Sequence, residues 1–304
     1  METNTPQFRA GYIALIGEPN VGKSTLLNAV LKQKISIVTN KPQTTRHKIL
    51  GIHSGEGYQM VFIDTPGIIK PKYLLQEVMM HFASQAVTDA DVVLMLVDAE
   101  KVKNKQYDRN NDAVERIKAA NKTTFLIVNK LDLLKKEEML PMLADLQTIF
   151  PFDEIIPLSA LTKFNVNELV QTLVKYLPEH PPYYDTEIVS DAQERFFVSE
   201  IIREKIFEQY EQEIPYSTTV DIVEFKEREQ GKYFISADIV IERDSQKGIL
   251  IGKEGKALKR LGSVSRRAVE EFIGHAVFLD LHVKVRENWR EDKNWLNSFG
   301  YKGE

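Results

Sequence analysis

The octapeptide Gly17-Glu18-Pro19-Asn20-Val21-Gly22-Lys23-Ser24 has the spacing G-x-x-x-x-G-K-S. It follows a short apolar run over 12–16 and opens a helical pattern over 23–31. A strand, a glycine-containing loop and a helix start in this order form a phosphate cradle, because inward-turned backbone N–H groups and the positive end of the helix both attract an anion. All eight residues are therefore predicted to bind a nucleotide. Lys23 is expected to bridge the β- and γ-phosphate oxygens, and Ser24 to ligate Mg²⁺.

The pattern around this loop alternates between strands and helices as far as residue 177. Further apolar runs predict strands over 48–53, 58–63, 92–97, 125–128 and 155–158. Helical patterns lie near 75–87, 104–121, 135–149 and 165–177. Such alternation predicts an α/β domain over 1–177, with a mostly parallel six-stranded sheet covered on both faces. Three prolines between 178 and 182 cannot continue a helix, so a linker is expected over 178–190.

Two further segments supply candidates for the metal and the γ-phosphate. Asp64-Thr65-Pro66-Gly67 ends the predicted strand 58–63, where Asp64 can hold Mg²⁺ and Gly67 can offer its N–H to the γ-phosphate. Pro42-Gln43-Thr44-Thr45-Arg46 has no clear periodicity, and a threonine hydroxyl in such a loop can complete the Mg²⁺ shell only when the γ-phosphate is present. Of the two threonines we prefer Thr45. The predicted metal ligands are Ser24, Thr45 and Asp64, and the predicted nucleotide contacts here also include Thr65, Pro66, Gly67 and Ile68.

The segment Asn129-Lys130-Leu131-Asp132 follows the predicted strand 125–128 and indicates a base pocket. An ionised Asp132 can accept hydrogen bonds from both N1–H and the 2-amino group of guanine, whereas adenine presents an acceptor at N1. The sequence therefore favours GTP over ATP. Asn129 is expected to bind the N7 side of the purine and to brace the loop, and the Lys130 stem to cover the ring. Leu131 is also included among the predicted GTP-binding residues. Ser159-Ala160 ends the last strand, where the Ala160 N–H can meet guanine O6.

The remainder of the chain has a different order. A long amphipathic helix is predicted over 191–213, followed by strands over 218–226 and 232–242, helical segments over 245–250 and 254–275, and a strand over 277–286. This order predicts a separate α+β domain over 191–287 and a tail over 288–304. The tail carries four aromatic residues, Trp289, Trp295, Phe299 and Tyr301, which we interpret as a packed C-terminal helix, with stacking on bases as the alternative.

A basic segment marks this second domain. Residues 243–267 contain eight Lys or Arg and two Asp or Glu, a candidate surface for a polyanion. The same segment holds the G-x-x-G sequence Gly252-Lys253-Glu254-Gly255 between two helical patterns, and the whole module resembles a type II KH domain, in which this loop approaches a nucleic-acid backbone. The predicted RNA-binding residues are Ile249, Leu250, Ile251, Gly252, Lys253, Glu254, Gly255, Lys256, Lys259, Arg260, Arg266 and Arg267. We expect the acidic helix 191–213 on the opposite face.

Composition excludes several other classes of protein. The chain has 304 residues and no cysteine, which excludes disulfides and cysteine nucleophiles. Its longest apolar run, Val92–Val97, is far shorter than the roughly 20 residues of a membrane-spanning helix. The polar N-terminus lacks the apolar core of a signal peptide. These features predict a cytoplasmic protein.

Residues 11–177 resemble a translation-factor-class GTPase domain, and nearly the whole chain resembles the Era family of bacterial GTPases. The resemblance is carried by Gly17–Ser24, Gln43–Arg46, Asp64–Ile68, Asn129–Asp132, Ser159-Ala160 and the KH-like module. It implies a GTPase of slow intrinsic turnover that binds the 3′ end of 16S rRNA and acts in 30S subunit assembly and rRNA maturation. The resemblance also allows a loose peripheral association with the inner membrane, and we expect the protein to be a monomer.

The resemblance leaves the activation of water open. Ile68 stands where Ras-like proteins have a water-orienting glutamine, and its side chain has no donor or acceptor. In related GTPases the asparagine equivalent to Asn20 holds K⁺ near the phosphates, which makes K⁺ a candidate cofactor beside Mg²⁺; Asn20 as a plain turn residue is the alternative. Arg46 is a second candidate cation. Lys23, Thr45, Gly67 and Asn20 are the candidates for assisting hydrolysis.

Two other functions compete with this interpretation. A tRNA-modification or protein-targeting GTPase would need a cofactor domain or a Met-rich module, and the seven methionines are scattered. A constitutive RNA-binding scaffold with a vestigial nucleotide site is disfavoured by the intact Lys23, Ser24, Asp64 and Asp132.

Overall fold

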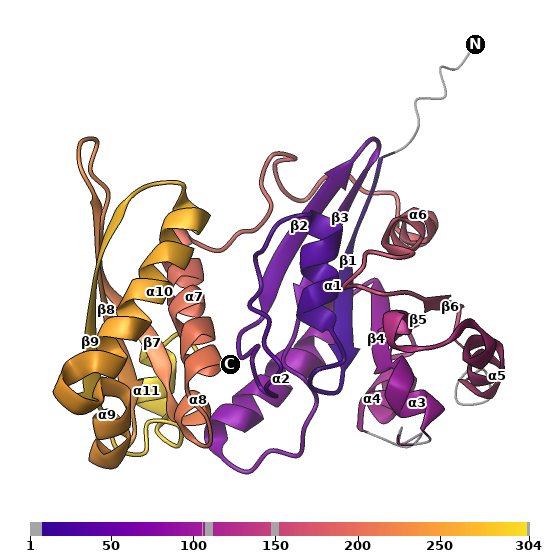
Figure 1. The fold of residues 1–304 in the computed structure, drawn as a ribbon. Helices are drawn as coiled ribbons and strands as arrows, with labels where there is room; N and C mark the ends of the chain where they lie inside the picture. The colour runs from indigo at the N-terminus through magenta and orange to yellow at the C-terminus, as the bar shows by residue number, and fades with distance from the viewer. Residues whose placement is uncertain (1–7, 105, 107–111, 147–151, 303–304) are drawn as a thin grey trace. The chain divides into compact units, whose positions relative to one another are not determined.

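The computed structural model describes residues 8–104, 106, 112–146 and 152–302. Their contacts divide the chain into two compact units, drawn in Figure 1. Unit 1 comprises Met1–Ser36, Thr45–Lys70 and Met79–Asp191, and unit 2 comprises Ile37–Thr44, Pro71–Val78 and Ala192–Glu304. Two short segments of the N-terminal half, both beside predicted nucleotide-binding motifs, therefore belong to the unit that contains the C-terminal module.

Unit 1 is built on a six-stranded sheet in the order β2-β3-β1-β4-β5-β6, parallel except for the β2–β3 pair. The strands are β1 (Arg9–Gly17), β2 (Ile49–Gly55), β3 (Tyr58–Asp64), β4 (Val92–Asp98), β5 (Thr123–Asn129) and β6 (Glu154–Pro157). The helices are α1 (Lys23–Leu31), α2 (Leu74–Asp89, of which the residues up to Val78 belong to unit 2), α3 (Ala99–Lys103), α4 (Asp112–Ala120), η1 (Leu131–Leu133), α5 (Lys136–Leu146) and α6 (Val166–Tyr176). The predicted mostly parallel six-stranded sheet is confirmed. The expected helices over 104–121 and 135–149 extend in part outside the described residues.

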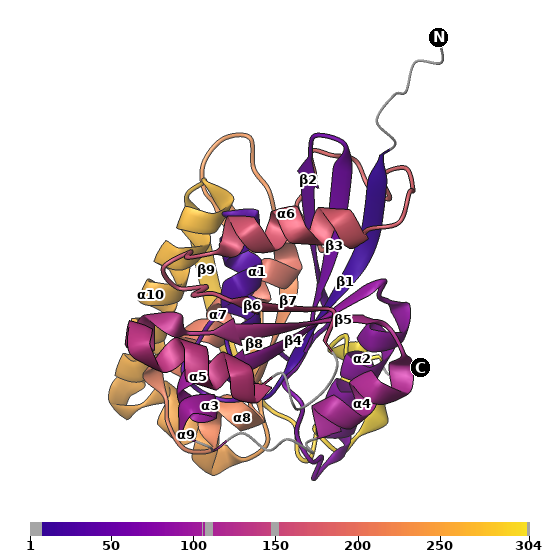
Figure 2. The same cartoon turned by 90° about the vertical axis from the view of Figure 1, so that its right-hand side faces the viewer.

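The core of unit 1 lies where helices cover both faces of this sheet. Every residue of β4 is buried, as expected for a central strand without a solvent face. Helices α1 and α6 pack together on one face, and α4 lies beside α2 on the other, where Arg116 donates to the Ser84 hydroxyl (Figures 1 and 2). The carboxyl ends of parallel strands meet at one edge of a sheet. The residues that end four of them, Gly17, Asp64, Asp98 and Asn129, are thereby gathered at one edge.

The predicted linker over 178–190 lies within unit 1 and is hydrogen-bonded to β2 and β3. The buried Gln59 amide accepts from the backbone N–H groups of Tyr183 and Tyr184 at 2.7 and 3.0 Å. Ile52 of β2 donates its N–H to Val189 O at 2.7 Å. Side-chain and strand-edge groups of unit 1 thus hold much of the proline-rich segment in place.

Unit 2 contains a three-stranded sheet in the order β7-β8-β9, with β7–β8 antiparallel and β8–β9 parallel. Its elements are α7 (Glu194–Gln209), α8 (Ile214–Ser217), β7 (Thr219–Lys226), β8 (Tyr233–Ile241), α9 (Asp244–Ile251), η2 (Lys253–Gly255), α10 (Lys256–Ile273), β9 (Val277–Val285) and α11 (Lys293–Ser298). Helices α7 and α10 pack against each other and against this sheet (Figure 1). The expectation that the acidic helix lies on the face opposite the basic one is therefore wrong: both cover the same sheet, and Glu200 and Glu204 of α7 are buried.

The aromatic tail completes the core of unit 2. Trp289 is fully buried and donates its indole N–H to Ser217 O at 2.9 Å. Tyr301 is also buried, and its hydroxyl lies 3.1 Å from that of Thr219. Trp295 stacks on Phe299 with a centroid separation of 5.7 Å. The tail is packed as expected, although helix α11 covers only part of it. Among the described residues, no helix is both long and apolar enough to span a membrane.

Candidate functional site

The phosphate loop joins β1 to α1, and its glycines are required by close approaches. Gly22 has a φ of 97°, and a Cβ there would lie 2.2 Å from the Asn129 side-chain nitrogen. A Cβ on Gly67 would lie 2.7 Å from the Pro19 backbone. The N–H of Ile68 donates to Gly17 O at 3.1 Å. The segment after β3 is therefore held directly against the phosphate loop.

Lys23 lies within this loop with its ammonium group bonded to backbone carbonyls. Its Nζ donates to Gly17 O at 3.1 Å and to Glu18 O at 2.9 Å. Burial lowers the pKa of Lys23 to about 8, although Asp64 and Glu18 partly offset the effect. A buried cation with only carbonyl partners favours an anionic ligand, which is the role predicted for this side chain.

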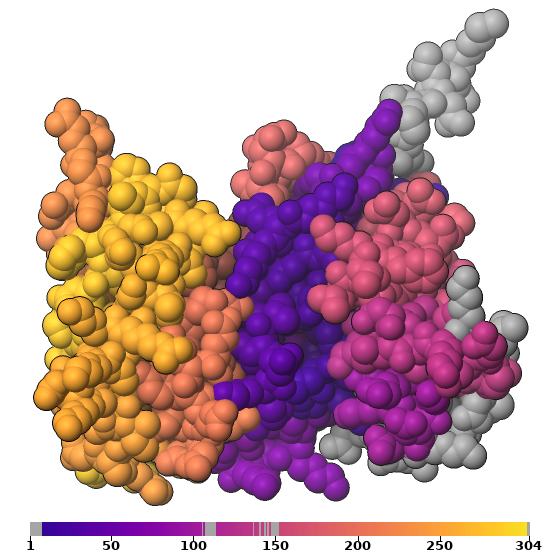
Figure 3. Space-filling model, in the orientation of Figure 1, coloured from indigo at the N-terminus to yellow at the C-terminus, as the bar shows by residue number. Residues whose placement is uncertain are grey.

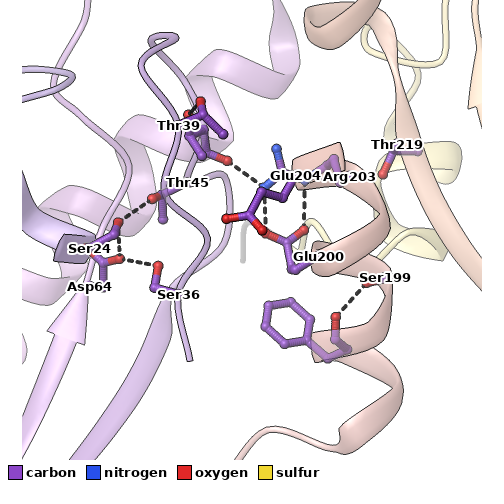
Figure 4. Close-up of polar contacts among 12 residues, drawn as sticks. Ser24, Ser36, Thr39, Thr45, Asp64, Ser199, Glu200, Arg203, Glu204 and Thr219 are labelled. Carbon is purple, nitrogen blue, oxygen red and sulfur yellow. Dashed lines mark hydrogen bonds and ion pairs between the residues drawn. The ribbon is translucent and has the colours of Figure 1, made fainter. Parts of the chain in front are cut away.

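The three predicted metal ligands come together in unit 1 (Figure 4). Ser24 Oγ donates to Asp64 Oδ2 at 2.7 Å and lies 2.9 Å from Thr45 Oγ1. Ser36, which sequence reasoning missed, also donates to Asp64 Oδ2, at 2.8 Å. Thr44 is placed differently, because its hydroxyl donates to Lys41 O and lies 2.6 Å from Thr39 Oγ1. This geometry supports the preference for Thr45.

These residues fit a magnesium ion. Asp64 is fully buried, and its Oδ1 has no hydrogen-bond partner among the described residues. Burial raises the pKa of Asp64, against the hydrogen bond from Ser24 and the charge of Lys23. A divalent cation would add positive charge beside this carboxylate and give its Oδ1 the partner that the described residues do not supply. Two hydroxyls and one carboxylate are the hard oxygen donors that Mg²⁺ prefers, with phosphates and waters completing the shell.

The predicted base-binding loops are tied to the phosphate loop through Asn129. Its Nδ2 donates to Val21 O at 2.8 Å, and its Oδ1 accepts from the Ala160 N–H at 2.9 Å. The bracing role predicted for Asn129 is thus present in the structure. The Ala160 N–H, predicted to meet guanine O6, donates to Asn129 here.

Asp132 remains exposed, and its Oδ1 accepts from the Ser159 hydroxyl at 2.5 Å. The Lys130 ammonium lies 2.7 Å from Asp98 at the end of β4. Sequence reasoning missed Asp98, since no motif marks it, although its place at a strand end was a usable signal. Asp132 is therefore exposed to a base, whereas Asn129 and Lys130 are bonded to the neighbouring loops and strand end.

Three residues considered for hydrolysis lie in different settings. Ile68 is buried at 8% exposure, so its side chain offers no polar atom to a water, as expected. Asn20 is exposed in the phosphate loop with a φ of 64°. Arg46 is 1% exposed, a burial that a solvent-facing cation would not show.

In unit 2 the G-x-x-G loop has a backbone suited to close approach. Gly252, Glu254 and Gly255 all have positive φ values, of 70°, 54° and 72°. A Cβ on Gly255 would meet no atom within 4 Å, so the space beside it is open. Gly255 lines a hollow of about 430 Å³ together with Leu258, Lys259, Gly262, Ser263, Arg266, Leu279 and Leu281. Helix α10 is uncovered on the face shown in Figure 3.

The structure sorts the predicted RNA-binding residues. Lys259 and Arg266 line the hollow, whereas Arg260 and Arg267 are exposed on α10 outside its lining. Ile249 is 52% exposed, but Leu250 is fully buried in the core of unit 2, so the prediction that Leu250 contacts bases is wrong. The apolar wall formed by Leu258, Leu279 and Leu281 was missed because two of these residues lie on β9, far from the motif in sequence.

Comparisons with known proteins agree with both halves of this description. Residues 12–130 match a family described as 50S ribosome-binding GTPase, and residues 213–290 match the KH domain. The GTPase Era of Geotalea daltonii is 46% identical over 295 residues, covering 97% of this chain and 98% of that protein. A chloroplastic GTPase ERA-like protein of Arabidopsis thaliana is 45% identical, covering 99% of this chain and 71% of its own length.

Two solved structures are similar over nearly the whole chain. Era in complex with MgGDPNP and nucleotides 1506–1542 of 16S ribosomal RNA has a TM-score of 0.90 and 36% identity, covering 97% of this chain and 99% of that one. A variant of Aquifex aeolicus Era bound to GDP·AlF4⁻ has a TM-score of 0.89 and 36% identity, with the same coverage of both chains. The shared motifs, the identity over almost the full length and the paired GTPase and KH domains lead to one conclusion: this chain belongs to the Era family of GTPases.

Proposed function

We propose that this GTPase binds and hydrolyses MgGTP in unit 1 and binds the 3′ region of 16S rRNA through unit 2, in assembly of the 30S subunit and maturation of its rRNA. The observation that carries the proposal is the presence in one chain of two separate candidate sites. One gathers Lys23, Ser24, Thr45 and Asp64 at a helix start. The other gathers Gly255, Lys259 and Arg266 around an open hollow.

In the nucleotide site each side chain has a distinct role. Lys23 neutralises charge on the β- and γ-phosphates, and the Gly67 N–H is available for the γ-phosphate. Ser24, Thr45 and Asp64 hold Mg²⁺, which neutralises charge on the phosphate oxygens when bound. Asp132 selects guanine. Because Ile68 offers no polar atom, the attacking water must be oriented by other groups, and intrinsic turnover is expected to be slow.

A potassium ion held by Asn20 is the cation that we propose to assist hydrolysis. Asn20 is exposed in the phosphate loop, whereas Arg46 is buried at 1% exposure. Exchanging K⁺ for Na⁺ at constant ionic strength should slow turnover, and Asn20→Ala should remove the difference between the two ions. Equal turnover in both salts would discard this role for Asn20.

The hollow in unit 2 suits a single-stranded RNA segment. Leucine side chains form an apolar wall for base faces, and Lys259 and Arg266 supply charge for phosphates. Gly255 leaves room for the RNA backbone beside the loop. We propose that GTP orders the segments 40–46 and 64–77 and that these then hold or release the KH domain.

The test is direct binding of a synthetic RNA with the sequence of nucleotides 1506–1542 of 16S rRNA, the segment present in the related complex. Affinity is measured with MgGDPNP, with MgGDP and without nucleotide, beside a scrambled RNA of equal length and charge. Preferential binding of the 16S sequence, with an affinity that changes between the nucleotide states, is expected. Identical affinity in all three states would overturn the switch, and equal binding of the scrambled RNA would overturn the proposed target.

A further inference from the structure

The segment Ile37–Thr44 belongs to unit 2, and helix α7 holds it at three points. At its start, the Val38 N–H donates to Glu204 Oε1 at 3.0 Å. In its middle, Lys41 Nζ donates to Phe207 O at 2.6 Å and also to Tyr210 O. At its end, Arg203 donates to Thr44 O. The segment is thus held at Val38, Lys41 and Thr44 by the first helix of the KH-containing unit and the residue that follows it. Figure 4 labels Arg203, Glu204 and Glu200 of this helix.

Arg203 is an unusual side chain for this position, because it is 1% exposed. Its Nε donates to Glu200 Oε1 at 2.8 Å, and its NH2 group reaches both Glu200 Oε2 and Thr44 O. Burial disfavours its charge, but Glu200 holds the pKa of Arg203 above its ordinary value. An apolar pair of similar size would often give equal or greater stability than such a buried ion pair. Stability alone is therefore a weak reason for a guanidinium to be aimed at a loop carbonyl.

The carbonyl that Arg203 binds lies next to a predicted magnesium ligand. Thr44 O belongs to the peptide unit that joins Thr44 to Thr45, and a peptide unit is planar and rigid. Fixing this oxygen therefore restricts the backbone from which the Thr45 hydroxyl projects. That hydroxyl lies 2.9 Å from Ser24 Oγ. The chain passes from unit 2 back to unit 1 at this same peptide.

We propose that Arg203 is a positioning residue for Thr45, so that a side chain of the KH-containing unit sets the geometry of the magnesium site. Glu204 assists by fixing the other end of the segment at Val38. The proposal rests on the proposed MgGTP site, and it makes α7 part of the nucleotide switch. Since Thr45 completes the metal shell only with the triphosphate, the effect must fall on the triphosphate state and spare the diphosphate state.

The experiment compares affinities of the full chain for MgGDPNP and MgGDP by calorimetry, without RNA. Arg203→Lys keeps the positive charge but loses the planar guanidinium, which donates to Glu200 and to Thr44 O at the same time. The matched control is Arg195→Lys. Arg195 is on the same helix, and its NH2 group donates to a backbone carbonyl, Ile222 O, at 2.7 Å, outside the segment 37–44. Arg203→Lys should weaken MgGDPNP binding about tenfold, as for loss of one charge-assisted hydrogen bond, with MgGDP binding unchanged. Arg195→Lys should leave both affinities unchanged.

A second pair of variants covers the case in which Arg203→Lys fails to fold. Glu204→Leu removes the acceptor for the Val38 N–H, whereas Glu204→Gln keeps an oxygen at the same place. Glu204→Leu should weaken MgGDPNP binding selectively, and Glu204→Gln should restore much of it. The proposal would be overturned if the folded variants lost equal affinity for MgGDPNP and MgGDP, or lost affinity for neither.

A double-mutant cycle with Thr45→Ala separates positioning from general support. If Arg203 acts through Thr45, its substitution should have little further effect on MgGDPNP affinity once the hydroxyl is gone. Additive losses would overturn the proposal. Failure of the MgGTP site itself is visible separately, because the unsubstituted chain would then not bind MgGDPNP.

Discussion

Asp132 is exposed just after β5, with one carboxylate oxygen bonded to Ser159 and the other available to a base. Asp132→Asn should lower GTP affinity by a factor on the order of 10²–10⁴, because the amide no longer accepts from both N1–H and the 2-amino group of guanine. Xanthine carries an oxygen in place of that amino group, so affinity for xanthosine triphosphate should rise. Competition binding with both nucleotides measures the change.

The control for this substitution is Lys23→Ala, which removes a phosphate contact. It should lower the affinities for GTP and xanthosine triphosphate by the same factor, so that their ratio does not change. If Asp132→Asn left the ratio of GTP affinity to xanthosine triphosphate affinity unchanged, that would contradict the role of Asp132 in base selection.

At the scale of single residues, the predictable part of the site is the part carried by contiguous motifs. Lys23, Ser24, Asp64 and Asn129 follow strands that are readable from apolar runs, so their meeting at one sheet edge follows from parallel topology. Ser36 donates to Asp64 and Asp98 pairs with Lys130, but neither lies in a motif. Their roles depend on how the chain returns to the sheet edge, which local sequence patterns do not determine.

At the scale of elements, helix α10 presents basic residues in two settings. The double variant Lys259→Ala/Arg266→Ala should weaken RNA binding and flatten its dependence on salt by about one unit of slope per lost phosphate contact. Arg260→Ala/Arg267→Ala removes the same charge from the same helix outside the lining of the hollow, so its effect should be smaller. Binding titrations at several salt concentrations distinguish them. Equal losses of RNA affinity in the two double variants would mean that RNA binding depends on the total charge of α10 and not on the residues that line the hollow.

The tail after β9 makes a separate prediction about stability. Trp289 is fully buried and bonded to Ser217 O, so Trp289→Ala should destabilise unit 2 by about 3–5 kcal/mol. Trp295 is only half-buried, and Trp295→Ala should lower the free energy of unfolding by less than Trp289→Ala does. Urea unfolding followed by circular dichroism measures both variants. If the two variants lost comparable free energy of unfolding, that would contradict the assignment of Trp289 to the core.

The order of the strands and longer helices was predictable from periodicity and turn residues, but the short helices α3 and α8 and the place of α7 were not. Its many carboxylates predict a solvated face, yet Glu200 pairs with Arg203 and Glu204 accepts from Val38. Charge counted along a helix does not show which charges are buried against partners from a distant segment. The assignment of Ile37–Thr44 to unit 2 escaped prediction for the same reason, since that segment has no periodicity of its own.

At the scale of the whole molecule, the two binding sites should be linked reciprocally. If MgGDPNP changes the RNA affinity by some factor relative to MgGDP, bound RNA must change the preference for MgGDPNP over MgGDP by the same factor. Measuring both sides of this cycle with the 1506–1542 RNA tests the coupling without reference to turnover. Unequal factors would show that a further equilibrium, such as self-association, takes part.

The two tryptophans, at 289 and 295, both lie in the tail of unit 2, and the chain has no others. One indole is buried in the core, and the other stacks on Phe299 and lies close to the Arg286 guanidinium. Intrinsic fluorescence from indole therefore originates in the KH-containing unit alone. A shift in that emission on addition of guanine nucleotide would be an optical signal, free of any attached dye, that the C-terminal unit responds to the ligand.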